Sequence, residues 1–600
     1  MHKVKHSRLR LFAILLTATG LFSGCAKELN QTPPSTASNA AVFGSADGLQ
    51  LYANSFYNIL PGISDVYKTD ASMSDIGTQS GVPSFLTLGS YTSRQTASAI
   101  GWSWTNLRNL NYFIANANIP KAGIPVATQQ NFVGLARFFR AYFYYGMVQK
   151  FGDVPWIGKP LGVNDSALYA RRDPRTLVMD SVLADLNYAC THITLTADPT
   201  ASQITKWVAY GLKSRICLFE GTFRKYQSVY GLQGTASQWL QDAASAAKAV
   251  MDSAGLKLNT TGGAGQSYRA LFISTAPVTT EVMLADVSSS SLAIYNDANW
   301  WFTSATYGAR FSFTRNFINT FLNIDGTPFT NIPGHDTLPF VKETVGRDMR
   351  LQQTIRMGSY KRTNAGVAVA APPVFSYTYT GYQPIKWVLD DMYNDNGVTN
   401  TNSICLMRYA EILLNYAEAK EELGQLLPAD WANTIGALRA RAGITGGLST
   451  APTVADPYLQ TNFYPDITDA ALLEIRRERA IELSLEGFRN ADLIRWKHGE
   501  LLAKPWNGMY VPALNQLMDL NADGVYDVCF YQGTPPSPQV SGVTYVNVAS
   551  NPQILSHGTY GELHWLDNVT KDWEDYKYVY PIPYSELLLN PNLVQNPQWQ

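Results

Sequence analysis

The chain has 600 residues, of which 46% are hydrophobic and 16% charged, and its formal net charge is −1. This balance is that of a globular protein and excludes a disordered tail protein, and the length predicts two or more packed subregions. The nearly neutral charge, with no basic stripe, excludes a nucleic-acid partner, which requires a basic face. Aromatic residues reach 12%, with 34 Tyr and 14 Trp, and these two residue types suit ligand platforms as well as cores.

Residues 1–24 have the features of an export signal. Four basic residues precede an apolar run over 11–22, and two small residues come directly before Cys25. This order is typical of a secretory signal peptide, and the run is shorter than the roughly 20 residues of a membrane span. The junction resembles a lipobox, in which the cysteine carries the lipid; ordinary cleavage beside an incidental cysteine is the alternative. The following polar, proline-containing residues predict a lipidated tether over 25–45.

Amphipathic helices are the main predicted elements of the next part of the chain, 46–255. The predicted segments are 46–60, 93–118, 127–151, 173–190, 204–224 and 235–254. Phe151-Gly152 supplies a stop for the third of them. Consecutive helices with short connections form antiparallel pairs, as in helical-repeat proteins, although no clean 34-residue repeat is present.

Glycine, serine and proline break the helical pattern over 256–403, which predicts loops and short strands. Long loops in a compact protein are where binding sites tend to lie. The last part, 404–600, is predicted to be helical first and irregular towards its end. Its predicted helices are 404–424, 429–442 and 468–488.

Several motifs occur in series along the mature chain. They are ARFFRAYFYY at 136–145 with FGDVP at 151–155, RYAEILLNYAEA at 408–419, IRRERAIEL at 475–483, EGFR at 486–489, DLIRW at 492–496, and YPIP and NPNLVQNP within 580–597. Together with the start at Cys25, these motifs resemble those of the SusD/RagB family of nutrient-binding outer-membrane lipoproteins. They cover nearly the whole mature chain in order, which makes the resemblance highly specific.

The resemblance implies a mostly α fold, a tetratricopeptide-like helical-repeat scaffold with an irregular, loop-rich ligand-binding insertion. It also implies a lipid anchor in the outer membrane, a glycan or peptide ligand, and a SusC-like TonB-dependent transporter as partner. We therefore expect a binding protein rather than an enzyme. The alternatives are a surface glycan-degrading enzyme of the same uptake system, a peptide- or glycopeptide-binding member, and a scaffold with protein partners alone.

Four glutamates, Glu474, Glu478, Glu482 and Glu486, recur at every fourth position of a predicted helix. Two carboxylates on one face are what a glycosidase needs as acid and base. Arginines are interleaved with them, however, and opposite charges at this spacing stabilise a helix and its neighbours. We interpret the four as a structural ion-pair network, and no catalytic motif is recognisable elsewhere.

A loop at 519–527 has the spacing of a calcium loop. Asp519, Asn521, Asp523 and Asp527 supply oxygen ligands at positions 1, 3, 5 and 9, with a glycine at position 6. The bidentate glutamate of position 12 is missing, because Phe530 stands there. A structural calcium ion is one interpretation of the loop, and a turn held by Asx side chains is the other.

The remaining cysteines, Cys190, Cys217, Cys405 and Cys529, match no zinc-binding spacing. Their pairing cannot be deduced from the sequence. We expect free, buried thiols.

Aromatic residues of the irregular region are the candidate ligand contacts. Trp300, Trp301 and Tyr307 lie among amide and carboxylate side chains, and a flat ring beside polar groups suits a sugar. Adjacent tryptophans in a loop cannot both point into one core pocket, although packing of one or both inside the protein is the alternative. Trp102 is the next candidate, whereas the spacing of Trp104 predicts a core position.

Overall fold

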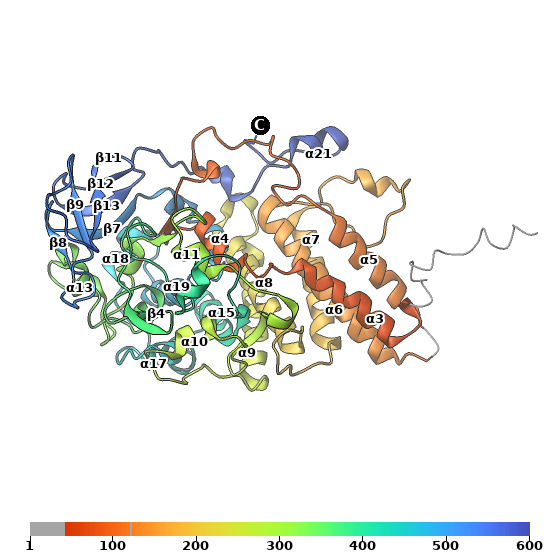
Figure 1. Cartoon of the computed structure of the whole chain (residues 1–600). Coiled ribbons are helices and arrows are strands. Elements are labelled where there is room, and N and C mark those ends of the chain that lie inside the picture. The colour runs from red at the N-terminus through yellow and green to blue at the C-terminus, as the bar shows by residue number, and fades with distance from the viewer. Residues whose placement is uncertain (1–41, 121–122, 600) are drawn as a thin grey trace, which may run out of the picture.

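The computed structural model describes residues 42–120 and 123–599 (Figure 1). The predicted signal peptide, Cys25 and most of the predicted tether therefore lie outside the described residues. In Figure 1 the helices of the N-terminal part occupy one side of the molecule and the C-terminal strands occupy the other. The last helix, α21, lies near the N-terminal helices α5 and α7.

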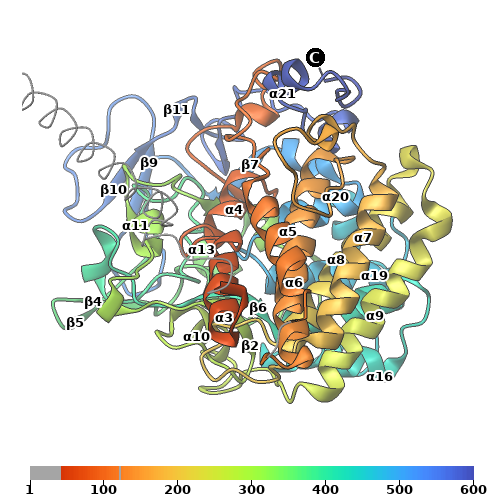
Figure 2. The ribbon, with the colours of Figure 1, turned by 90° about the vertical axis from the view of Figure 1, so that its right-hand side faces the viewer.

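The N-terminal part is helical, as predicted. Its helices are α3 (Ala46–Asn54), α4 (Val66–Ser72), α5 (Thr105–Ala117), α6 (Val126–Phe151), α7 (Arg175–His192), α8 (Lys206–Tyr226) and α9 (Ala236–Ser253). Helices α5 to α9 pack each against the next, and Figure 2 looks onto this group of helices. Helix α9 also packs against α15 (Tyr409–Glu422). This layered arrangement is a tetratricopeptide-like helical scaffold, which confirms the predicted fold class.

Two turns define where these helices start and stop. Helix α6 ends at Phe151 because Gly152 has a φ of +71°, a conformation that glycine adopts without strain, as the sequence indicated. Helix α5, in contrast, begins only at Thr105, so the predicted helix 93–118 is wrong over its first twelve residues. Gly101 has a φ of +78°, which is not a helical conformation, so the helix cannot include this residue.

The start of the predicted helix 404–424 is also wrong. Residues Ile404–Arg408 form strand β6, which pairs antiparallel with β2 (Val282–Asp286). The pattern of a short apolar run fits a strand and a helix equally well. Here the run forms a strand because it pairs with β2, which lies more than a hundred residues earlier in the chain. Helix α15 therefore begins at Tyr409, whose backbone N–H donates to the Glu281 carbonyl at 2.9 Å.

Short elements fill the rest of the chain. The helices are α10 (Ser267–Ile273), α11 (Ala298–Thr303), α12 (Arg315–Ile318), α13 (Phe340–Glu343), α14 (Leu351–Thr354), α16 (Pro428–Trp431), α17 (Ala437–Arg441), α18 (Pro457–Asn462), α19 (Ala470–Glu482), α20 (Arg489–Trp496) and α21 (Tyr584–Leu589). Strand β1 (Gly77–Thr78) pairs with β3 (Ser312–Phe313), and β4 (Lys361–Asn364) pairs with β5 (Val367–Ala370). Over 256–403 these elements give the irregular character expected there, whereas α16, α17 and α19 lie in the part that was predicted to be helical.

Two small sheets form the C-terminal part. One has the order β11 (Ala549–Ser550), β12 (Gln553–Leu555), β13 (Gly561–Trp565) and β7 (Trp506–Val511). The other has the order β10 (Thr544–Asn547), β9 (Val528–Tyr531) and β8 (Leu517–Met518). Apolar residues of these strands join one buried core with residues from α10 to α14, whereas α5 to α9 surround another.

Helix α19 is shorter than the predicted 468–488. It ends at Glu482, because the chain turns and Leu485 has a left-handed backbone with a φ of +59°. Glu486 therefore lies beyond the helix rather than on its face. Local charge spacing placed all four glutamates on one helix, and the structure corrects this for the last of them.

The four glutamates are nevertheless buried and ion-paired, as interpreted from the sequence. Glu482 accepts hydrogen bonds from Arg350 at 2.9 Å, from Arg408 at 2.6 Å and from Arg441. Burial alone would raise the pKa of Glu482, but these guanidinium groups outweigh it and hold the pKa well below its usual value. All three arginines come from other segments of the chain, not from α19.

The described part of the chain contains no helix that is long and apolar enough to cross a membrane. The four cysteines described, Cys190, Cys217, Cys405 and Cys529, are free and buried. Burial raises the pKa of the Cys190 thiol to about 12. These four side chains therefore have the inert, core-packed character that the sequence predicted.

Candidate functional site

A buried carboxylate organises the segment around α11. Asp297, which is 3% exposed, accepts hydrogen bonds from Lys68 Nζ at 2.7 Å, from the Tyr307 hydroxyl at 2.5 Å and from the Tyr67 hydroxyl. Burial would raise the pKa of Asp297, but these hydrogen bonds outweigh it and lower the pKa. Asp297 therefore stays charged and fixes Tyr307 against the start of α11.

The Tyr307 ring stacks on Trp300. The two ring centroids are 3.6 Å apart with an interplanar angle of 12°, and both side chains are half-buried. Trp301, in contrast, packs against the core and presents its ring edge-on to Tyr307, with 5.9 Å between centroids. Its indole N–H is buried without a hydrogen-bond acceptor in the described protein. The structure thus brings the three predicted aromatic residues together and separates a surface stack from a packed tryptophan.

Two contributors to this site come from α4, far away in sequence. Lys68 lies with its Nζ atom 4.8 Å from the centre of the Trp301 ring, a cation–π distance, while it pairs with Asp297. Tyr67 is fully buried behind the same carboxylate. No local pattern pointed to either residue, because about 230 residues separate α4 from α11.

A second aromatic stack adjoins the turn after Tyr307. Tyr379 and Trp565 stack with centroids 3.7 Å apart, and the Arg310 guanidinium lies 4.2 Å from the Tyr379 ring centre. The Trp565 indole donates to the Gln79 carbonyl at 2.9 Å. Four distant segments thus meet here, and sequence reasoning did not find this cluster.

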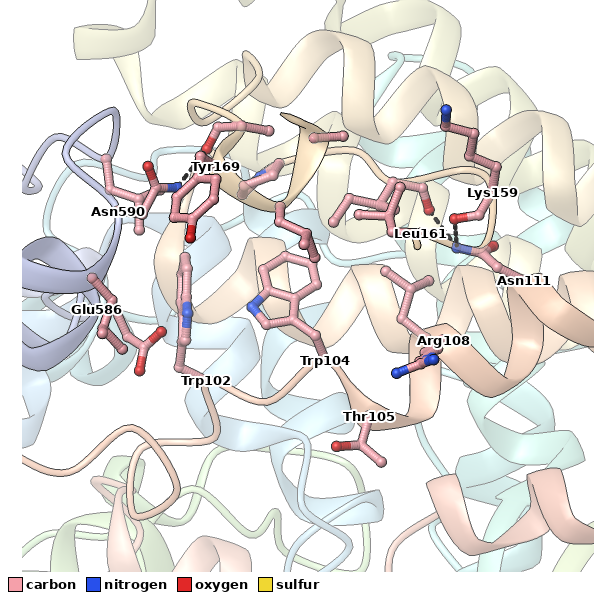
Figure 3. Close-up of a pocket in the computed structure, with 18 residues that line it drawn as sticks. Trp102, Trp104, Thr105, Arg108, Asn111, Lys159, Leu161, Tyr169, Glu586 and Asn590 are labelled. Atoms are coloured by element: carbon pink, nitrogen blue, oxygen red, sulfur yellow. Dashed lines mark hydrogen bonds between the residues drawn. The ribbon is translucent and has the colours of Figure 1, made fainter. Parts of the chain in front are cut away.

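Trp102, the other predicted contact, lies apart from α11 in the wall of a cavity beside α5 (Figure 3). The cavity has a volume of about 470 Å³ and is enclosed by the start of α5, the loop 155–170 and α21. Trp102 and Trp104 meet edge to face with centroids 5.4 Å apart. Trp102 is 5% exposed and also packs against Phe151 at 4.9 Å, so its ring is part of the scaffold as well as of the wall.

The walls of this cavity are mainly apolar. They include Leu107, Pro155, Ile157, Leu161, Leu589 and Leu593. The Asn111 side-chain amide donates a hydrogen bond to the Ile157 carbonyl at 2.7 Å. Figure 3 shows Glu586 and Arg108 on opposite sides of the two indole rings. Because sugar hydroxyls need hydrogen-bond partners, the surroundings of the Trp300–Tyr307 stack suit a sugar better than this cavity does.

The loop 519–527 forms a turn closed by its own side chains. Asp519 accepts hydrogen bonds from the backbone N–H groups of Ala522 at 2.7 Å and Gly524 at 2.8 Å. Among the residues that the structure describes, no group of three or more His, Cys, Asp and Glu side chains is arranged to hold a metal ion. Burial, together with the charges of Asp519 and Asp523, raises the pKa of Asp527 to about 6. A bound cation would relieve this crowding of carboxylates.

We predict that calcium stabilises this loop. A ligand that binds only the folded protein adds about 2.7 kcal/mol at a hundred times its Kd, so EDTA should lower the Tm and added calcium should restore it. The Asp523→Ala variant, which lacks one ligand, should show neither response. An unchanged Tm after chelation, with no calcium in elemental analysis of the purified protein, would leave the loop as a turn only.

The fold and the site define a helical scaffold that presents an aromatic stack from an irregular region. A sequence profile of the SusD family matches residues 287–599, more than half of the chain. The chain therefore belongs to the SusD family. No curated protein sequence matches it.

Solved structures share the fold over nearly the whole chain. A SusD-like protein from Bacteroides fragilis NCTC 9343 superposes with a TM-score of 0.68 at 20% identity, covering 95% of this chain and 100% of its own. A SusD-like carbohydrate-binding protein from the same organism gives 0.66 at 18% identity, covering 92% and 100%. A SusD homologue from Bacteroides thetaiotaomicron VPI-5482 gives 0.60 at 18% identity, covering 95% and 100%. At these identities the likeness concerns the fold.

Proposed function

We propose that this protein is a surface lipoprotein that binds a glycan oligosaccharide and delivers it to a SusC-like TonB-dependent transporter. The observation that carries the proposal is the half-buried Trp300–Tyr307 stack, which Asp297 holds in place. Sugars have apolar C–H faces and hydroxyl groups, and an aromatic ring beside polar side chains suits both. The carbohydrate-binding description of one matched structure supports the same ligand class.

An enzyme of the same uptake system is the competing function. The glutamates that could serve as an acid and base pair are buried and engaged by arginines, for example Glu478 by Arg350 at 2.8 Å and by Arg439 at 2.7 Å. These ion pairs favour a structural role and support binding without catalysis. A peptide or glycopeptide is the alternative ligand.

Affinity electrophoresis tests the proposal. The soluble form, residues 26–600, is run through gels that contain starch, xylan, mannan, arabinan or pectin, and the same mixtures are assayed for new reducing ends. Retention by one polysaccharide without new reducing ends is the expected result. Release of products would indicate an enzyme, and retention by a peptide digest alone would indicate the alternative ligand.

Lipid anchoring at Cys25 is part of the proposal, and it rests on the sequence around that residue. Acyl chains on one cysteine give stable membrane anchoring when more than one chain is attached. Replacing Cys25 by Ser should therefore move the protein from the outer-membrane fraction to the soluble fraction, as measured by immunoblotting after cell fractionation. A Cys25→Ser protein that stays in the outer membrane would contradict the assignment.

A further inference from the structure

An open cavity of about 760 Å³ lies at the C-terminal end of α11. It is bounded by the end of α11, the turn of the β4–β5 hairpin and the 3₁₀ turn Met392–Asp395. Figure 2 shows β4 and β5 at the edge of the molecule, on the same side as α11. The cavity is larger than the one beside α5, and its lining is mostly polar.

The floor of this cavity is held in place by buried contacts. Asp395 pairs with Arg362 at 2.7 Å and accepts a hydrogen bond from the Asn299 side chain at 3.1 Å. The Thr303 hydroxyl donates to the Asn299 carbonyl at 2.6 Å, within α11. Strand β4, which carries Arg362, is thereby fixed to α11, so the walls are built before any ligand arrives.

The polar side chains nearer the opening are available to a ligand. In the part of the chain that the structure describes, the amides of Asn364 and Asn396 and the hydroxyl of Tyr377 have no hydrogen-bond partner in the protein. The Asp391 carboxylate accepts one hydrogen bond, from the Tyr393 backbone N–H at 3.0 Å. Tyr393 is 76% exposed, so its ring presents a free face. Amides, a carboxylate and aromatic rings are the groups that bind sugar hydroxyls and C–H faces.

The cavity adjoins the Trp300–Tyr307 stack. Ser304, which lines the cavity, accepts a hydrogen bond from the Tyr307 backbone N–H at 3.0 Å. Thr303, also in the lining, follows Trp300 by three residues on α11, which is a rise of about 4.5 Å along the helix. The cavity therefore begins within about one helical turn of the stack.

The charge of the lining indicates which glycans fit. Its ionisable acids are Asp391 and Asp395, of which Arg362 neutralises the second, and no Lys, Arg or His side chain lines the cavity. An acidic sugar would place its carboxylate or sulfate beside Asp391 without a cation to compensate. Uncharged sugar units avoid this repulsion.

We propose that this cavity is a second saccharide subsite, which binds the uncharged sugar units that extend beyond the Trp300–Tyr307 stack. The inference rests on the proposed glycan-binding function and adds chain-length selection and charge selection to it. Oligosaccharides that extend from the Trp300–Tyr307 stack into the cavity gain contacts with Tyr393 and Asn396. A disaccharide bound at the stack does not reach these two residues.

Calorimetric titration of the full-length protein in detergent tests this inference. The probes are neutral xylo-, malto- and manno-oligosaccharides of two to eight units, with oligogalacturonates as acidic probes. Tyr393→Ala and Asn396→Ala should each weaken binding of the longest neutral probe by about tenfold, the size expected for one anchor contact, and leave the disaccharide affinity unchanged. Tyr560→Ala, another exposed tyrosine away from the cavity, is the matched control and should leave both affinities unchanged.

The possible outcomes distinguish failure of the second subsite from failure of the proposed glycan-binding function. If Trp300→Ala weakens binding while Tyr393→Ala and Asn396→Ala change no affinity at any chain length, the stack binds the glycan and the second subsite is refuted. Tighter binding of oligogalacturonates than of every neutral probe would also overturn it. If no probe binds the unaltered protein, the proposed function fails and the inference fails with it. Tyr393→Ala should leave the Tm unchanged, because the Tyr393 side chain is exposed. An unchanged Tm would show that the variant is folded.

Discussion

Replacing Arg408 by Met should lower the free energy of unfolding by about 3–5 kcal/mol, the typical result of removing one partner of a buried ion pair. Arg408 is 1% exposed, and its guanidinium bonds Glu486 at 2.8 Å, Glu281 at 2.9 Å and Glu482 at 2.6 Å. Its removal leaves these carboxylates buried with fewer compensating charges. Chemical denaturation of the soluble form, followed by circular dichroism, measures the change.

An exposed ion pair provides the matched control. Lys248 and Asp252 are one helical turn apart on α9, and their side chains are 48% and 54% exposed. Lys248→Met should cost at most about 0.5 kcal/mol, because solvent screens such pairs. Arg408→Lys should fall between the two, since it keeps the charge and loses the planar fork. Equal effects of Arg408→Met and Lys248→Met would contradict a stabilising role for the network.

Trp300→Ala should reduce the affinity for the retained glycan by roughly thirtyfold, which corresponds to about 2 kcal/mol for an aromatic anchor. The reason is that Trp300 is half-buried in the stack with Tyr307, at the surface, so truncation removes contact area for the ligand. Affinity electrophoresis or calorimetry with the retained glycan measures the loss.

Trp301→Ala separates binding from packing in the same helix. Trp301 packs on the core beside Lys68, and Gly308, with a φ of +76°, lies directly against its ring. Its truncation should therefore lower the Tm, as core truncations of aromatic residues do. If Trp300→Ala leaves the affinity unchanged, the contact lies elsewhere, and the cavity beside Trp102 is the next place to test by Trp102→Ala.

Much of the helical scaffold could be predicted from local pattern. The apolar pattern and the stop at Gly152 identify α6, α7, α8 and α9 within a few residues. Helix α8 is buried on more than one face, since residues 216–224 are all buried. The series of motifs pointed to the SusD family, and the profile match over 287–599 confirms it. The expectation of an aromatic cluster over 300–307 also arose from residues that lie close together in sequence.

Contacts between distant segments were decided by the tertiary structure alone. The i,i+4 spacing predicted that arginines near α19 neutralise its glutamates, yet Glu482 is paired with Arg350, Arg408 and Arg441, since the fold brings these segments around the helix. In the same way, Lys68 reaches Asp297 from another helix. Helix periodicity depends on neighbours within a few residues, so the sequence determines it locally. Burial, ion pairing and the choice between Trp300 and Trp301 as the surface ring depend on which distant side chains fill the surrounding space, and only packing sets that.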